Sequence, residues 1–293
     1  MQEIKICPIC AGIEFVSKFT CKDYTVSQES FKIIECVKCH FLITSPRPDE
    51  SEIGKYYLSD KYISHSGKAK TLIDSIYLKV RNITLAQKLK LVESYKGSAE
   101  ILDYGCGTGE FLNSCKTNFW NISGVEPSIS AREKASKLTQ TDIHSSIDSI
   151  TNKKYDVITL WHVLEHITSL ENTLLSLIEK LKEGGTLIIA VPNHKSEDAI
   201  YYNEYWAAYD VPRHLWHFSK ETMSKLLTKH SLTITKIQPM KFDSFYVSML
   251  SENHKNGKSS LLSNVKAFAK GLLSNSKAAS TGEYSSLIYV IKK

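Results

Sequence analysis

Long apolar runs are missing from this sequence of 293 residues. No uninterrupted apolar stretch approaches the length of a membrane span, and the opening MQEIKICPIC lacks the apolar core of a signal peptide. The chain also has no internal repeat and no low-complexity tract. The sequence therefore predicts a cytoplasmic protein that has no membrane partner. Seven cysteines are an odd number for a disulfide framework, so a reducing compartment with free or metal-bound thiols is expected.

A strong excess of charge of one sign is also missing. The formal net charge is +6, which suits an anionic partner but falls short of the clustered basic face of a nucleic-acid binder. Hydrophobic residues make up 42% and charged residues 23%, so a sizeable core is expected, in one large domain or a core domain with an appendage. The lysines of the late segment are interpreted as a solvated helix face: Lys255, Lys258, Lys266, Lys270 and Lys277.

Four cysteines stand in the first forty residues as two pairs. A two-residue spacer brings both sulfurs of a pair to one side of a tight turn, and two such turns supply a tetrahedral zinc site. Four-thiolate sites are closed and structural, so the site is expected to stabilise the fold rather than take part in chemistry. A hairpin of EFVSKF and FKIIEC would fill the intervening residues. The predicted ligands are Cys7, Cys10, Cys36 and Cys39.

Three segments are expected along the chain. A zinc-ribbon-like module covers residues 1–45, a mostly helical connector or lid covers 46–96, and a core domain covers 97–293. In the core domain, apolar strands alternate with amphipathic helices, with insertions at about 197–218 and 242–282. This alternation predicts an α/β fold with a Rossmann-like, doubly wound sheet that is mainly parallel. The strands are expected at 100–105, 121–127, 141–144, 155–161, 184–193, 232–240 and 285–293.

The loop DYGCGTGEFL follows the first strand of this domain, where a doubly wound sheet binds its ligand. A nucleoside triphosphate would require a Lys followed by Ser or Thr, but Gly109 is followed by Glu110 and Phe111. Glu110 also occupies the position of a dinucleotide motif's third glycine, where its carboxylate would repel a pyrophosphate. S-adenosylmethionine has no phosphate and requires carboxylates near its ammonium and ribose. Asp103 and Glu126 end the first two strands and meet this requirement.

On these residues, 98–293 resembles the class I S-adenosylmethionine-dependent methyltransferases. The matching segments are ILDYGCGTGEFL, ISGVEPS, YDVITLWHVLEHI and LKEGGTLIIAVPN. DVPRHLWHFSKETMSKLL resembles the subgroup that contains ubiquinone-pathway O-methyltransferases, and a cysteine-rich module in front of such a domain resembles sugar C-methyltransferases. The resemblance implies a seven-stranded sheet whose last, antiparallel strand lies between the fifth and sixth. It implies cofactor contacts at Asp103, Gly105, Cys106, Gly107, Glu126, Pro127, Trp161 and His162.

The chemistry requires alignment of two atoms and, for an alcohol or carbon acceptor, a base. His214 and His217 follow the fifth strand and are the candidates, with ordering of the insertion by hydrogen bonds as the alternative. His65 lies before the connector helices, which could cover the cofactor pocket, and the alternative is that it is an exposed loop residue. Ubiquinone-pathway enzymes have a Glu-Glu-His metal arrangement, of which only Glu165 and His166 match here.

The predicted function is methyl transfer to O or C of a small molecule or sugar. Two alternatives remain at this stage. RNA methylation would use the zinc module and late lysines to hold RNA, although no Asn-Pro-Pro-Tyr loop is present. A non-catalytic nucleoside-binding protein could retain the fold, although it would not need both Asp103 and Glu126.

Overall fold

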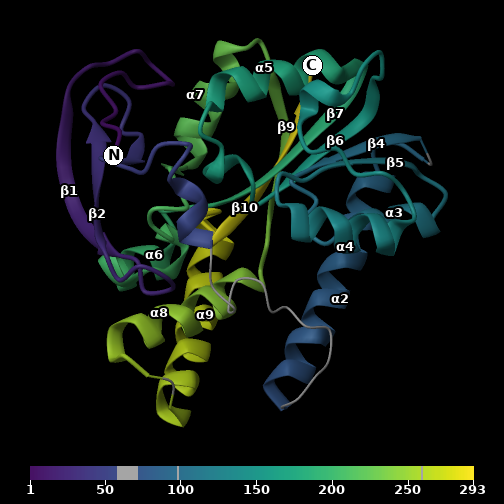
Figure 1. Ribbon diagram of the computed structural model, residues 1–293. Coiled ribbons are helices and arrows are strands. Elements are labelled where there is room, and N and C mark those ends of the chain that lie inside the picture. The colour runs from purple at the N-terminus through teal and green to yellow at the C-terminus, as the bar shows by residue number, and fades with distance from the viewer. Residues whose placement is uncertain (58–71, 98, 259) are drawn as a thin grey trace.

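The computed structural model describes residues 1–57, 72–97, 99–258 and 260–293, and only the backbone of 72–78. His65 therefore lies outside the described residues. The large sheet has six strands in the order β5-β4-β6-β7-β10-β9 (Figure 1). Its strands are β4 (Glu100–Tyr104), β5 (Asn121–Val125), β6 (Tyr155–Trp161), β7 (Leu181–Pro192), β9 (Thr233–Pro239) and β10 (Ser286–Lys292).

The direction of the strands agrees with the predicted doubly wound fold. β4 pairs in parallel with β5 and with β6, and β6 pairs in parallel with β7. The last strand, β10, is antiparallel to both neighbours and lies between β7 and β9, as the resemblance implied. The carboxyl ends of β4, β5, β6 and β7 therefore meet at one edge, where such folds bind ligands.

Helices cover both faces of this sheet because its central strands are apolar on both sides. In β7, Leu187 and Ile189 belong to a different core cluster from Ile188 and Ala190, as the alternation of strand side chains requires. Figure 1 shows α5 and α7 over the first face and α2, α3 and α4 over the second. The helices are α2 (Leu72–Glu93), α3 (Glu110–Thr117), α4 (Ile129–Thr139), α5 (Leu170–Lys180) and α7 (Lys220–Lys229).

The prediction of a third strand at 141–144 is wrong, so the sheet has six strands rather than seven. Residues 141–144 form only an isolated parallel bridge between Val125 and His144, held by two backbone hydrogen bonds. The Ser146 side chain accepts a hydrogen bond from the backbone N–H of Asp148 and caps a short 3-10 helix, Ile147–Ser149. This turn begins two residues beyond His144, so the chain leaves the sheet edge before a ladder can form.

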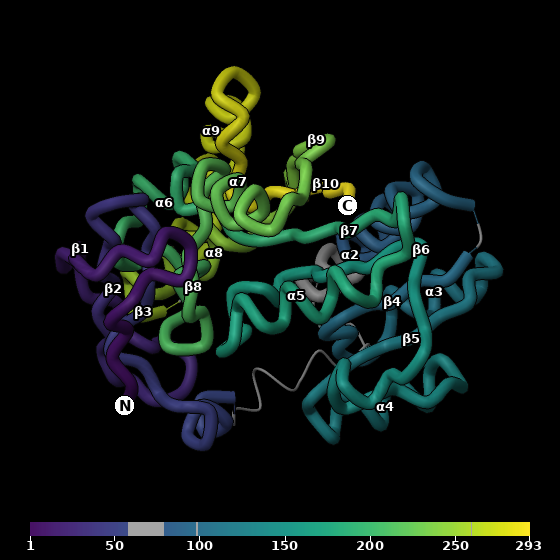
Figure 2. Tube along the Cα trace, turned by 90° about the horizontal axis from the view of Figure 1, so that it is seen from above, coloured from purple at the N-terminus to yellow at the C-terminus, as the bar shows by residue number. Residues whose placement is uncertain are grey.

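The N-terminal residues form a second, antiparallel sheet in the order β1-β2-β3-β8. The predicted hairpin is present as β1 (Phe15–Lys22) and β2 (Ser30–Cys36), followed by β3 (Leu42–Thr44). The fourth strand, β8 (Trp216–His217), comes from the insertion after β7 and pairs with β3 (Figure 2). Apolar side chains from the insertion and from this sheet share one core, which includes Phe31, Ile33, Tyr202 and Trp206.

The insertions add short helices and a helical hairpin. The first contains α6 (Glu197–Tyr202) and the 3-10 turns Asn203–Tyr205 and Ala207–Tyr209. The second contains α8 (Asp243–Asn256) and α9 (Leu261–Thr281), which pack against each other and project from the sheet in Figure 1. The connector contributes a 3-10 turn at Ile53–Tyr57 in addition to α2. Within the described parts of the chain, every helix is too short or too polar to cross a membrane.

Candidate active site and cysteine cluster

The glycine-rich loop lies at the carboxyl end of β4 and has a backbone that side chains would disfavour. Gly105, Gly107 and Gly109 all have positive φ angles, of 75°, 55° and 86°. A Cβ on Gly105 would come within 2.5 Å of a Val163 methyl, and one on Gly109 within 2.9 Å of the Ala135 Cα. A Cβ on Gly107 would meet nothing within 4 Å. The backbone at Gly107 is therefore accessible to a ligand. A nucleoside cofactor requires such an open backbone in order to approach the loop closely.

Glu126 follows β5 and lies against this loop. One carboxylate oxygen accepts a hydrogen bond of 2.9 Å from the Gly107 backbone N–H, and the other accepts one of 2.8 Å from the Ser128 N–H. Each bond uses only part of the acceptor capacity of its oxygen, so the fixed carboxylate can still accept bonds from a diol. Pro127 lies between Glu126 and Ser128, and Arg132 donates to the carbonyls of Glu126 and Pro127.

Asp103 is buried beneath the loop. Its Oδ1 accepts a 2.6 Å hydrogen bond from the Thr159 hydroxyl on β6. Burial raises the pKa of Asp103 to about 7, while the Thr159 bond and the nearby Lys88 ammonium oppose that rise. The Lys88 Nζ lies 4.5 Å from the centre of the Trp161 ring, an arrangement of the cation–π type. Cys106 is buried in the same loop and packs with Leu112 and Ala135.

His162 follows Trp161 and bridges two carboxylates. Its Nε2 lies 3.1 Å from Asp243 Oδ2, and its Nδ1 lies 3.3 Å from Glu165 Oε1. Burial lowers the pKa of His162, but the two carboxylates outweigh that effect and raise it to about 9. His162 is therefore protonated at neutral pH and is unsuited to act as a base. A cavity of about 640 Å³ opens beside this pair, lined by residues that include Lys88, Phe242 and Asp243.

His166 and His214 form a second group with Glu165. Their rings meet edge to face with centroids 4.5 Å apart. The His214 Nδ1 lies 2.8 Å from the Ala208 carbonyl, which can only accept, so Nδ1 carries the proton and Nε2 has the lone pair. The His166 Nδ1 lies 3.1 Å from the Arg213 carbonyl and 3.1 Å from the Tyr57 hydroxyl, which fixes the same tautomer.

The third member of this group, Glu165, has an unusual environment. The residue is fully buried, and its Oε2 atom has no hydrogen-bond partner among the described residues. One donor atom from each of Glu165, His166 and His214 lies within 4.8 Å of the others. The group could therefore share a proton or hold a divalent cation. Burial and the neighbouring His214 lower the pKa of His166 to about 4.

His217 has a different environment from His214. It lies buried on β8, and its Nε2 is 2.9 Å from the Thr44 hydroxyl oxygen. Thr44 donates its only hydroxyl proton to the His214 carbonyl, at 2.7 Å, so His217 must donate to Thr44. Burial holds the pKa of His217 well below its ordinary value. His217 therefore acts as a structural hydrogen-bond donor within the N-terminal sheet, because β8 and β3 are neighbouring strands of that sheet. Ordering by hydrogen bonds is the alternative that sequence analysis had given for this residue.

The four N-terminal cysteines gather at one point. The Cys7 and Cys39 sulfurs are 3.5 Å apart, as are those of Cys10 and Cys36, and all four lie within 4.8 Å of one another. A tetrahedron with Zn–S bonds of about 2.3 Å has edges slightly shorter than 4 Å, so the sulfur positions fit a zinc ion. Cys21 lies apart from this group, in the core that the N-terminal sheet shares with the insertion.

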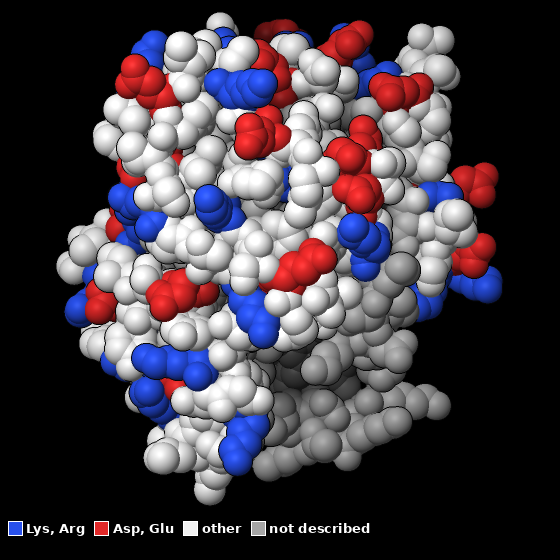
Figure 3. Space-filling model, turned by 60° about the vertical axis from the view of Figure 1, so that its left-hand side comes forward, with Lys and Arg blue, Asp and Glu red and all other residues white. Residues whose placement is uncertain are grey.

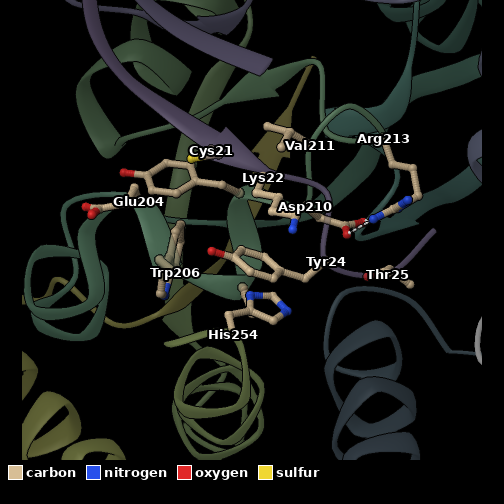
Figure 4. A pocket seen from close by; sticks show the side chains of 12 residues that line it. Cys21, Lys22, Tyr24, Thr25, Glu204, Trp206, Asp210, Val211, Arg213 and His254 are labelled. Atoms are coloured by element: carbon tan, nitrogen blue, oxygen red, sulfur yellow. Dashed lines mark hydrogen bonds and ion pairs between the residues drawn. The ribbon is translucent and has the colours of Figure 1, made fainter. Parts of the chain in front are cut away.

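A buried ion cluster, which sequence analysis did not predict, lies beside the histidines. The Arg213 guanidinium binds Asp210 at 2.6 Å and 3.0 Å and Asp23 at 3.0 Å, and it donates to the Tyr56 carbonyl. Figure 4 shows the Asp210–Arg213 pair at one side of a small cavity, in which Tyr24 stacks on His254. The i, i+3 spacing of Asp210 and Arg213 is the one sequence signal for this pair.

Comparisons with known proteins agree with this geometry. A family model described as a methyltransferase domain matches residues 78–237, which is more than half of the chain. The chain therefore belongs to the methyltransferase domain family. With the doubly wound sheet and the glycine-rich first loop, it is a class I S-adenosylmethionine-dependent methyltransferase.

Individual relatives are distant. A ubiquinone biosynthesis O-methyltransferase of Rickettsia canadensis is 25% identical over 49% of this chain and 66% of its own length, slightly less than two thirds. The Rickettsia felis protein of the same name is 24% identical over 67% of this chain and 85% of its own. A methyltransferase structure from Archaeoglobus fulgidus covers 76% of this chain and 100% of that chain at 20% identity, with a TM-score of 0.50. This likeness concerns the fold.

Proposed function

We propose that this protein transfers a methyl group from S-adenosylmethionine to an oxygen or carbon atom of a small-molecule or sugar acceptor. The observation that carries the proposal is the open backbone at Gly107 beside the fixed Glu126 carboxylate. Bound there, S-adenosylmethionine supplies a methyl group that is already activated as a sulfonium. The residues proposed to hold it are Asp103, Gly105, Cys106, Gly107, Glu126, Pro127, Trp161 and His162.

His214 is the proposed base. Its Nε2 lone pair is kept free because the Ala208 carbonyl holds the proton on Nδ1. Asp210 Oδ2 lies 3.9 Å from Nε2, and the unpartnered Glu165 oxygen belongs to the same group, so carboxylates are available to stabilise the imidazolium after it takes a proton. His217 is unsuited to this role, because its ring already donates to Thr44.

Two further observations support the class of acceptor and the zinc ion. The cavity of about 640 Å³ beside Asp243 is within the range of small-molecule sites. Asp243, which lines the cavity, pairs with His162, and His162 is linked through Glu165 to the proposed base. The cysteine cluster is proposed to hold one structural zinc ion through Cys7, Cys10, Cys36 and Cys39. A closed four-thiolate site leaves no open position for chemistry.

The cofactor assignment is tested by calorimetric titration with S-adenosylhomocysteine. Glu126→Ala should weaken binding by at least about tenfold, the usual effect of losing charge-assisted hydrogen bonds. Glu133→Ala, at an exposed position on α4, is the matched control and should bind like the wild type. If the folded wild-type protein does not bind S-adenosylhomocysteine, or if both variants bind equally well, the assignment is wrong.

The base is tested by transfer from radiolabelled S-adenosylmethionine to a panel of nucleotide sugars, free sugars and phenols. His214→Asn should bind S-adenosylhomocysteine normally but transfer methyl groups roughly 10²- to 10⁴-fold more slowly. His217→Asn should mainly lower stability. If transfer is equally fast in His214→Asn, the base lies elsewhere. If only a structured RNA accepts the label, RNA methylation replaces the proposed acceptor class.

A second role for Glu165, His166 and His214 is to hold a divalent cation. It is favoured by their mutual distances within 4.8 Å and by the unpartnered Glu165 oxygen. Two imidazoles and a carboxylate are suitable ligands for a transition metal. Metal analysis of wild-type protein and of Glu165→Gln separates this role from proton transfer, because only a cation site would give a second equivalent of metal that the variant loses.

A further inference from the structure

The cavity of about 640 Å³ beside Asp243 has a lining separate from the cofactor cradle. The described residues that line it come from α2 and the residue after it, from β9 and the loop that follows, and from α8, α9 and β10. None of them belongs to the glycine-rich loop or to residues 126–128, which form the cradle. This separation leaves the cavity for a second small molecule, the methyl acceptor. An inference about the cavity therefore rests on the proposed methyl transfer.

One side of α2 forms a wall of this cavity. Four residues of the helix line it, at spacings of three, one and three residues, which place them on one helix face: Thr84, Gln87, Lys88 and Leu91. Lys88 is the charged residue among them, and its Nζ lies 4.5 Å from the centre of the Trp161 ring. Because Trp161 is a proposed cofactor contact, a group bound at Lys88 would lie close to the cofactor.

The half-buried Lys88 ammonium has no adjacent counterion. Among the described residues it makes neither a hydrogen bond nor an ion pair within 4.0 Å. Asp103 and Asp243 favour its charged form from further away, but burial outweighs them and lowers the pKa of Lys88. Both carboxylates have other partners, since Asp103 accepts from Thr159 and Asp243 pairs with His162. Such an ammonium gains more from a bound anion than a fully solvated lysine does.

The other charges of the cavity lining leave a positive balance. Lys241, in the loop after β9, is the second lysine, and Asp243 is the one carboxylate among the described lining residues. Asp243 is already paired with the protonated His162. Over most of the face shown in Figure 3, by contrast, Lys and Arg side chains are interspersed with Asp and Glu. The positive balance is therefore a property of the cavity and not of that surface as a whole.

The loop that contains Lys241 is held in place from α8 and α9. The Asn275 side chain donates a 2.8 Å hydrogen bond to the Lys241 carbonyl, and the Ser244 hydroxyl donates to the same oxygen at 3.2 Å. These bonds fix the backbone at Lys241, although its side chain is exposed. The remaining polar side chains of the described lining are neutral and can bind hydroxyl groups: Thr84, Gln87, Ser94, Gln238 and Asn275.

We propose that the methyl acceptor is an anionic small molecule whose phosphate or carboxylate group binds Lys88, with Lys241 as a second, weaker contact. Lysine binds such groups as a compact point charge, and the neutral amides and hydroxyls around it suit a hydroxylated acceptor. A neutral phenol or a free sugar would leave the Lys88 ammonium without a counterion. A nucleic acid is less suitable, because its binding site requires basic residues along an open face rather than inside a cavity.

The test is calorimetric titration of the full-length, zinc-loaded protein with and without saturating S-adenosylhomocysteine. Two pairs of probes differ by an anionic group: UDP-glucose against glucose, and salicylate against phenol. Inorganic pyrophosphate tests the anion alone. Wild-type protein should bind the anionic member of a pair at least about tenfold more tightly than its neutral partner. The pair that shows this difference distinguishes a phosphate from a carboxylate.

Variants assign the binding to Lys88. Lys88→Gln should weaken binding of the anionic probe at least about tenfold, and Lys88→Arg should restore most of it, because it keeps the charge. Lys241→Gln should have a smaller effect that disappears at high salt, because this lysine is exposed. Lys90→Gln is the matched control, since Lys90 lies on α2 but is exposed and outside the cavity lining. All four variants should bind S-adenosylhomocysteine like the wild type, which also shows that they are folded.

The proposal is overturned if folded wild-type protein binds none of the anionic probes at millimolar concentration, or binds the neutral partners equally well. It is also overturned if Lys88→Gln binds the anions as tightly as the wild type. Loss of S-adenosylhomocysteine binding in Lys88→Gln would assign this lysine to the cofactor instead of the acceptor. Failure of the proposed methyl transfer is distinguishable, because the wild type would then not bind S-adenosylhomocysteine, whatever its affinity for the anions.

Discussion

The Thr44 hydroxyl donates a 2.7 Å hydrogen bond to the backbone carbonyl of His214, although 170 residues separate them. The same hydroxyl oxygen accepts from His217. One buried threonine of the N-terminal sheet therefore fixes the backbone of the proposed base and the ring of its neighbour.

Replacing Thr44 by Val should leave the His214 carbonyl and the His217 N–H without this partner. We expect a loss of about 1–3 kcal/mol in the free energy of unfolding, the cost of unpaired buried polar groups. Transfer should also slow, because the base is held less rigidly. Urea unfolding and turnover measure the two effects. Thr20→Val, at an exposed position on β1, should change neither, and a stable, fully active Thr44→Val protein would contradict this role.

Two glycines of the first loop should respond differently to alanine. At Gly109 a Cβ would come within 2.9 Å of the Ala135 backbone at a φ of 86°, so Gly109→Ala should destabilise the fold by about 3 kcal/mol. At Gly107 the space is open, so Gly107→Ala should cost only the 1–2 kcal/mol or so of left-handed backbone strain. Its larger effect should be on S-adenosylhomocysteine binding. Unfolding and calorimetry on both variants check the contrast, and equal effects would contradict it.

The ion pairs of His162 with Asp243 and Glu165 predict that the free energy of unfolding depends on pH. The pKa of His162 is about 9 in the folded protein and returns to an ordinary value of 6.5 on unfolding. The resulting stabilisation is fully present below about 6.5 and is lost as the pH rises through about 9. Compared with His162→Gln, the wild type should lose on the order of 1–2 kcal/mol across this range, since solvent reaches part of the ring. Unfolding at several pH values measures the difference, which would stay constant if the imidazole were neutral.

Removal of the proposed zinc ion should affect the loop that contains His214 as well as the N-terminal sheet. Cys36 lies at the end of β2, which pairs with β3, and β3 contains Thr44. Cys36→Ser should lower the bound zinc from one equivalent per chain to little or none and reduce the melting temperature by several degrees. Methyl transfer should fall with it. Elemental analysis and thermal unfolding give the readouts.

Cys21→Ala is the control for zinc removal, because Cys21 is equally buried but belongs to another core cluster. It should retain its zinc. Wild-type protein that contains no zinc after purification in zinc-supplemented medium would contradict the proposed site.

Sequence analysis was most successful where the residues of one short segment determine its local structure by themselves. The loop after β4 needs glycines because of its positive φ angles, and the hairpin of β1 and β2 follows from local alternation. The third strand failed for a local reason too, since Ser146 starts a turn two residues after the bridge at His144. The alternation of strands and helices was sufficient to predict a mainly parallel sheet, whereas the position of β10 between β7 and β9 was predicted only by the resemblance to class I methyltransferases.

The histidine group could not be derived in this way. The group combines Tyr57 from the connector, His166 from the turn after β6 and His214 from the insertion after β7. Only tertiary contacts bring these three segments together. Arg213 and Asp23 are 190 residues apart, and no periodicity connects them. The sequence also could not distinguish His214 from His217, because their roles differ through partners from remote segments, Ala208 in one case and Thr44 in the other.

Strand β8 has only two residues, yet it restricts how this enzyme could be shortened or recombined. A chain that began after the connector would leave Trp216 and His217 without β3 and would remove Asp23 from the buried Arg213. Breaking a buried ion pair by deleting one partner typically costs 3–5 kcal/mol or so. The cysteine module and the insertion should therefore be exchanged between related enzymes together. Either one transplanted alone would lack the surface against which it packs in this protein.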